Sequence, residues 1–138
     1  MINLLANLLV IEGIRAWLDG QDDESLRQWF GALRDPQIGR VLMALHNEPG
    51  GHWTVERMAR LASMSKSSFH QAFKSTVGVT PLKYVLYWKM HFAASRLSTT
   101  KDSVAEVATA CGYDSESAFS RAFRRELGYA PREARALR

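Results

Sequence analysis

The chain has 138 residues, 46% of them hydrophobic, with a single cysteine and a formal net charge of +4. This length and apolar content suffice for one compact domain with an added helix, and one cysteine excludes a disulfide framework. Residues 1–51 carry a net charge of −3 and residues 52–138 carry +7, so the C-terminal part is the one suited to a polyanionic partner.

The first segment, residues 2–18, places apolar side chains almost all round a helix and ends at Asp19 and Gly20. It is too short and too polar to span a membrane. Two interpretations stay open: the helix packs on its own domain, or it pairs with a second copy. Residues 1–20 are thus a separate N-terminal apolar helix, and the polar residues 21–34 are interpreted as a linker. No charged leader with a cleavage site is present, so a cytoplasmic protein is expected.

Asp35 and Pro36 form a helix start, and an apolar stripe continues from Ile38 to about His46. A turn follows, and Thr54 is placed to cap the first of two short helices that extend to Gly78. His46 and His52 lack a partnered His or Cys at ligand spacing, so no metal site is expected.

Thr80 caps and Pro81 opens a long helix over residues 80–98. At about 1.5 Å per residue it covers about 25 Å, which is of the order of the spacing between successive major grooves. Its expected buried side consists of Leu82, Val85, Leu86, Met90, Ala93, Ala94 and Leu97.

Residues 103–128 contain a second pair of short helices. Ser103 and Glu106 form a capping box, Gly112 ends the first helix, Asp114 or Ser115 can cap the second, and Gly128 ends it. Two short helices joined by a tight turn make a helix-turn-helix. The second helix leaves a cationic, hydrogen-bonding face outside its apolar stripe, as a helix in a DNA groove requires. A short final helix is expected over residues 130–137.

The two helix pairs are copies of one another. Val55, Met58 and Ala59 align with Val104, Val107 and Ala108 at an offset of 49 residues; past the turn the offset is 50. There, the aligned pairs are Ser65 with Ser115, Phe69 with Phe119, Phe73 with Phe123, Gly78 with Gly128 and Pro81 with Pro131. Apolar, capping and helix-ending residues therefore repeat in register, which predicts two DNA-reading helices.

The chain resembles the DNA-binding domain of the AraC/XylS family of bacterial transcription regulators over about residues 35–138. The residues that carry the resemblance are Ala59, Met64, Ser65, Phe69, Phe73, Gly78, Thr80 and Pro81 in the first unit, and Ala108, Gly112, Tyr113, Ser117, Phe119, Phe123, Gly128 and Pro131 in the second. Ser63 and Ala130 depart from the family pattern, which often has glycine and Ser or Thr there.

The resemblance implies an all-α fold of seven helices: homeodomain-like tandem helix-turn-helix units (residues 54–78 and 103–128), joined by the long helix, read successive major grooves of a double-stranded DNA operator. Residues 2–18 are similar to the dimerising helix that ends the N-terminal effector domain in many members. A homodimer through this segment, a remnant of such a domain, and a contact with RNA polymerase are expectations of the resemblance. No cofactor is implied.

Site residues follow from the family positions and from side-chain chemistry. The base-reading candidates are Ser67, His70 and Gln71 in the first unit, and Glu116, Ser117, Ser120 and Arg121 in the second. The phosphate-binding candidates are Lys66, Lys74, Arg124 and Arg125.

The sequence therefore indicates a sequence-specific DNA-binding protein that is not an enzyme. Three alternatives are a protein-interaction module, a non-specific DNA binder, and a DNA-repair enzyme that uses Cys111. The enzyme requires an accessible thiolate, whereas Cys111 ends a buried helical stripe and aligns with Ala62, which favours a small core residue. The operator, the effector and the choice between activator and repressor stay open.

Overall fold

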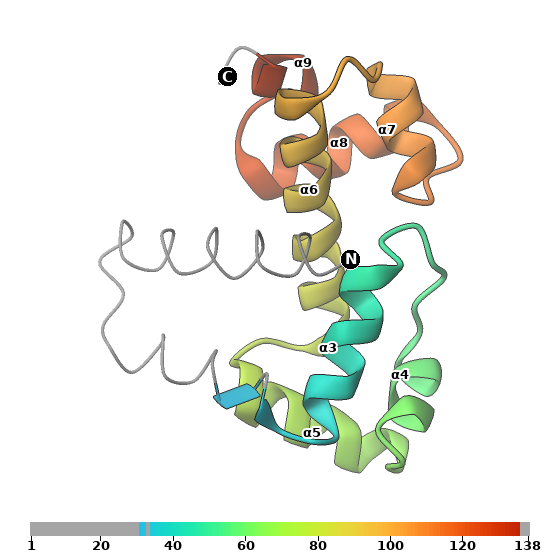
Figure 1. Cartoon of the computed structure of the whole chain (residues 1–138), viewed down its shortest axis with the longest axis vertical. Helices are drawn as coiled ribbons and strands as arrows, with labels where there is room; N and C mark the ends of the chain where they lie inside the picture. Colours follow the sequence, from blue (N-terminus) through green and yellow to red (C-terminus); the bar gives the residue numbers. More distant parts are fainter. Residues whose placement is uncertain (1–30, 33, 136–138) are drawn as a thin grey trace. The chain divides into compact units, whose positions relative to one another are not determined.

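The computed structural model describes residues 31, 32 and 34–135 (Figure 1), and all regular structure within them is helical, which confirms the all-α fold class. The predicted N-terminal helix and residues 21–30 of the predicted linker lie outside the described residues. At the end of that linker, Gly31, Ala32 and Arg34 are helical. The helices are α3 (Ile38–Asn47), α4 (Val55–Leu61), α5 (Lys66–Val77), α6 (Pro81–Thr99), α7 (Val104–Ala110), α8 (Glu116–Leu127) and α9 (Pro131–Ala134).

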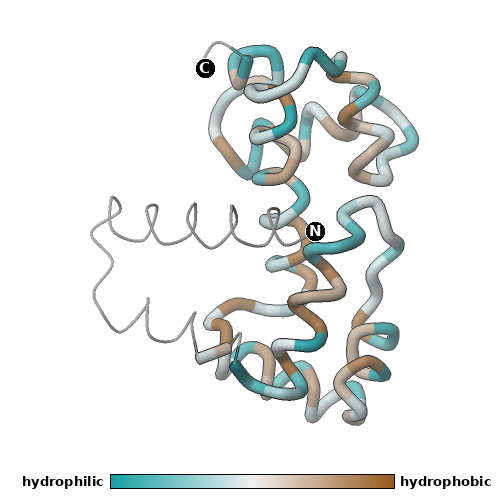
Figure 2. Tube along the Cα trace, viewed as in Figure 1, coloured by the Kyte–Doolittle hydropathy of each residue, from teal (hydrophilic) through white to brown (hydrophobic). Residues whose placement is uncertain are grey.

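The chain divides into two compact units. The described residues up to Asn47 join Trp53–Lys83 in the first, and Glu48–His52 join the residues from Tyr84 onward in the second. The first unit therefore holds α3, α4, α5 and the start of α6, and the second holds the rest of α6 with α7, α8 and α9. Hydrophobic and hydrophilic residues are interspersed along these helices (Figure 2).

In the first unit, polar side chains start the helices where the sequence predicts. Asp35 Oδ1 accepts hydrogen bonds from the backbone N–H of Gln37 and Ile38, both at 2.9 Å. Thr54 Oγ1 caps α4, Ser65 Oγ caps α5, and Gly78 ends α5 with a φ of 100°. The helices enclose a core of fully or almost fully buried residues: Ile38, Val41, Leu42, Leu45, Met58, Ala59, Phe69 and Phe73.

The second unit is built in the same way around α8. Its core contains Met90, Ala93, Leu97, Val107, Ala108, Cys111, Phe119, Ala122, Phe123 and Ala134. Ser103 Oγ accepts from the Glu106 backbone N–H at 3.1 Å, and Ser115 rather than Asp114 caps α8. Ala130 precedes α9 without a side-chain cap, and α9 covers Pro131–Ala134. Residues 136 and 137 of the predicted final helix lie outside the described residues.

One side chain of α6 contradicts the predicted stripe. Val85, Met90, Ala93 and Leu97 are buried as expected, but Leu82 is 53% exposed. The buried residues at the start of α6 are Pro81, Tyr84, Val85 and Trp88. Their spacing of three and four residues defines a helix face that does not include Leu82.

A close backbone contact holds the segment Glu48–His52 in the second unit. A Cβ on Gly50 would lie 2.6 Å from the carbonyl oxygen of Ala110, and one on Gly112 would lie 2.8 Å from the carbonyl oxygen of Gly50. Only glycines allow this approach. Lys89 Nζ, on α6, donates to the Gly51 carbonyl at 3.4 Å and adds a second contact to this segment.

The turn of the first helix-turn-helix carries backbone strain. Ser63 has a φ of 57°, and its counterpart in the repeat, Gly112, has a φ of 82°. An L-residue in the left-handed region is disfavoured by roughly 1–2 kcal/mol relative to glycine. Ser63 thus occupies a conformation that the second unit gives to glycine.

We therefore predict that Ser63→Gly stabilises the protein. Relief of strain exceeds the added entropy of glycine in the unfolded chain, roughly 0.4–1 kcal/mol, so a net gain of up to about 1 kcal/mol is expected in denaturant unfolding. A loss of stability would contradict the strain assignment.

His46, in the last turn of α3, is buried in the first unit with only 1% of its surface exposed. Burial lowers the pKa of its imidazole to about 3, so the side chain is neutral in the folded protein. In the unfolded chain the pKa of a histidine imidazole is about 6.5, so His46 takes up a proton there below this pH.

His46 should make the protein sensitive to mild acid. Its contribution to stability is complete above about pH 6.5 and is lost as the pH falls towards 3, with a slope of up to about 1.4 kcal/mol per pH unit. In His46→Leu the free energy of unfolding should change by about 2 kcal/mol less between pH 6.5 and 5 than in the wild type. Equal pH dependence in the two proteins would refute this.

Candidate nucleic-acid interface

Helix α5 has one buried and one exposed face. Phe69 and Phe73 are fully buried, with ring centroids 5.6 Å apart. The opposite face exposes all five residues predicted for DNA contact in the first unit: Lys66, Ser67, His70, Gln71 and Lys74. The structure therefore brings these candidates together on one accessible surface.

A surface hollow lies beside this face, between the starts of α4 and α5. It is lined by Val55, Ser65, Lys66, Ser67, His70 and Gln71. Lys66 Nζ forms an ion pair with Glu56 Oε1 at 2.8 Å. Sequence reasoning missed Glu56, because this contact joins two helices and has no counterpart in the repeat.

Helix α8 repeats the arrangement in the second unit. Phe119, Ala122 and Phe123 are buried, and the Phe119 and Phe123 ring centroids are 5.7 Å apart. Tyr113, from the turn, packs edge-on against Phe119. Ser120 is half-buried, and the other candidates are exposed: Glu116, Ser117, Arg121, Arg124 and Arg125.

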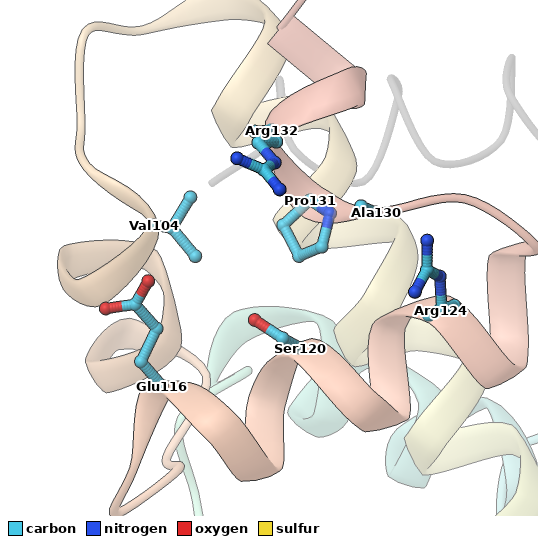
Figure 3. A pocket seen from close by; sticks show the side chains of 7 residues that line it. All are labelled: Val104, Glu116, Ser120, Arg124, Ala130, Pro131 and Arg132. Carbon is cyan, nitrogen blue, oxygen red and sulfur yellow. The ribbon is translucent and has the colours of Figure 1, made fainter.

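The second unit also has a surface hollow beside its exposed helix face (Figure 3). Figure 3 shows Glu116 and Ser120 on α8, Val104 on α7, and Pro131 and Arg132 at the start of α9 around one space, which Arg124 and Ala130 also line. Arg132 is therefore a further cation beside the predicted reading face. Arg132 belongs to the final helix that the sequence predicts over residues 130–137.

The two hollows share three equivalent positions of the repeat and differ in the rest of their linings. Val55 and Val104 occupy equivalent positions, as do His70 and Ser120. Lys66, however, is replaced by Glu116, which inverts the charge at the start of the reading helix. The first residue of α5 and the first residue of α8 therefore carry opposite charges.

Cys111 lacks the properties of a catalytic nucleophile. It is fully buried, and its Sγ donates a weak hydrogen bond to the Lys89 carbonyl at 3.7 Å. Burial raises the pKa of the thiol to about 11, which disfavours the thiolate. Cys111 is a core residue of the second unit.

Within residues 31, 32 and 34–135, no group of three or more His, Cys, Asp or Glu side chains is arranged to hold a metal ion. No helix among these same residues is long and apolar enough to cross a bilayer.

Comparisons with known proteins agree with this geometry. Residues 58–136 match the model of a helix-turn-helix domain family of the AraC type. The chain is 36% identical over 131 residues to the HTH-type transcriptional regulator AlkR of Acinetobacter baylyi, covering 95% of this chain and 42% of that one. This chain thus spans less than half the length of the curated relatives it matches.

Two solved structures are similar as well. The DNA-binding domain of AdpA, a global transcriptional factor crystallised with a target DNA, is 36% identical with a TM-score of 0.67; the match covers 75% of this chain and 92% of that chain. A transcriptional regulator from Chromobacterium violaceum with an AraC-type DNA-binding domain is 26% identical with a TM-score of 0.68, over 73% of this chain and 90% of that chain.

Proposed function

Because the chain belongs to the AraC-type helix-turn-helix family, we propose that it binds double-stranded DNA sequence-specifically as the DNA-binding part of a bacterial transcription regulator. The observation that carries the proposal is the repeated surface: two helices, each anchored by two buried phenylalanines, each exposing polar and cationic side chains. A helix of this kind fits the major groove.

Within this function the exposed residues divide into two roles. Arg121 can bind a guanine edge with two hydrogen bonds, Gln71 an adenine edge, and Glu116 can accept from the amino group of cytosine. Ser67, His70, Ser117 and Ser120 complete the base-reading set. Lys66, Lys74, Arg124 and Arg125 are assigned to phosphates, which fix register but carry no sequence information.

Other parts of the proposal rest on sequence and on family membership. Residues 2–18 are proposed to form a homodimer contact, and the regulator is proposed to act in the cytoplasm and to contact RNA polymerase. An enzymatic role is not proposed, since the buried Cys111 thiol offers no accessible nucleophile.

Substitutions should separate the two roles. Arg121→Ala should weaken binding to an operator selected from a random duplex library by roughly fivefold to 150-fold, the equivalent of about 1–3 kcal/mol for one lost bidentate base contact, with a much smaller effect on random duplex. Lys74→Ala should weaken both about equally and reduce the slope of log affinity against log salt by about 0.9. Fluorescence anisotropy with labelled duplexes gives both quantities.

Arg125→Ala is the matched control, because it removes the same side chain from the same exposed face of α8 but from a proposed phosphate contact. Equal losses on operator and random DNA for Arg121→Ala would remove Arg121 from the base-reading set. An affinity insensitive to salt in the wild type would contradict duplex binding itself.

A further inference from the structure

The ion pair between Glu56 and Lys66 occupies a functional position in the first unit. Glu56 is in the first turn of α4, and Lys66 is the first residue of α5. Their charged atoms are 2.8 Å apart, although the side chains are 55% and 64% exposed respectively. Lys66 also lines the hollow beside Ser67, His70 and Gln71. A nucleic acid that reaches these base-reading candidates therefore approaches this pair.

The Glu56 carboxylate neutralises the Lys66 ammonium group without DNA. A cation at a helix N-terminus is disfavoured by the helix dipole, and the neighbouring carboxylate offsets this for Lys66. The hydrogen bond from Lys66 is the main cause that lowers the pKa of the Glu56 carboxyl, so Glu56 remains charged near neutral pH. Exposed pairs of this kind contribute little to folding stability. The Glu56 carboxylate also accepts hydrogen bonds from Thr54 and from its own backbone N–H at the start of α4.

We propose that Glu56 attenuates the sequence-independent binding of the first unit to DNA by neutralising Lys66. A phosphate that binds Lys66 must displace the Glu56 carboxylate or lie close to it, and both options are opposed by repulsion between the two anions. Because the pair has no net charge, its contact with a phosphate also releases less counterion than a free lysine would. The inference rests on the proposed DNA-binding function and assigns a regulator of affinity to the same surface.

The internal repeat shows that the helix-turn-helix does not require this pair. The position equivalent to Glu56 in the second unit is Ala105, and the position equivalent to Lys66 is Glu116. The second unit nevertheless forms a hollow beside α8, and its lining includes Glu116, Arg124 and Arg132. Attenuation through a paired lysine is thus a property of the first unit, and the second unit should supply more of the backbone affinity.

Glu56→Gln tests the inference, with Glu106→Gln as the matched control. Each change raises the net charge of +4 by one unit, and each site is an exposed glutamate in the first turn of the first helix of its helix-turn-helix. Glu106 interacts with Ser103 Oγ at 3.1 Å rather than with a cation, and glutamine retains an acceptor oxygen there. Thermal unfolding checks that both variants are folded.

Affinity for a random-sequence duplex is measured across a salt series. Glu56→Gln should bind roughly threefold to tenfold more tightly than Glu106→Gln at low salt, and its log affinity should fall more steeply with log salt by about 0.9, the equivalent of one added phosphate contact. Equal affinities and slopes for the two variants, or weaker binding by Glu56→Gln, would overturn the proposal.

Lys66→Met distinguishes neutralisation of Lys66 from a general effect of charge. In this background Glu56→Gln should give no greater gain than Glu106→Gln; a persistent excess would overturn the role of Lys66. Duplex binding by the wild-type protein distinguishes a failure of the attenuation from a failure of the proposed function. If it binds duplex but the variants do not differ, only the attenuation fails, whereas a wild type that does not bind duplex contradicts the proposed function.

Discussion

The burial of two phenylalanines one helical turn apart fixes the orientation of each reading helix about its own axis. Phe69 and Phe73 in α5, and Phe119 and Phe123 in α8, are completely removed from solvent. Each such side chain contributes roughly 1.5–3 kcal/mol through burial, far more than any exposed polar contact. The position of the phenylalanines determines which residues face outward. Gln71 and Arg121 are exposed because they lie on the helix face opposite the buried phenylalanines. The candidate interface is in this sense a consequence of the core.

Local features of the fold could be predicted from the sequence because their causes are local. Thr54, Ser65, Ser103 and Ser115 cap helices through bonds to backbone groups three residues away, and the glycines Gly78 and Gly128 end helices through their own φ angles. The internal repeat doubled each of these signals. The spacing of the phenylalanines also predicted which faces of α5 and α8 are exposed.

What the sequence could not provide depends on contacts between distant segments. The approach of Gly50 to Gly112 and the bond from Lys89 to Gly51 bring together residues far apart in the chain. The exposure of Leu82 depends on which side of α6 is covered at its start. Glu56 was invisible as a site residue because its partner lies on another helix. The fold of each unit could therefore be predicted without the charges that surround its exposed residues. These charges differ between the two copies of the repeat.

The proposed function requires both helix-turn-helix units to read base pairs. A direct test selects bound sequences from a random duplex library at near-physiological salt. The affinity of the protein is then measured for the selected site and for random DNA. If both units read base pairs, the selected site contains two blocks of specified base pairs and is bound at least about a thousandfold more tightly than random duplex. A single block would mean that only one unit reads bases. No enrichment, with weak binding that disappears as salt rises, would contradict the claim and favour a protein-interaction module.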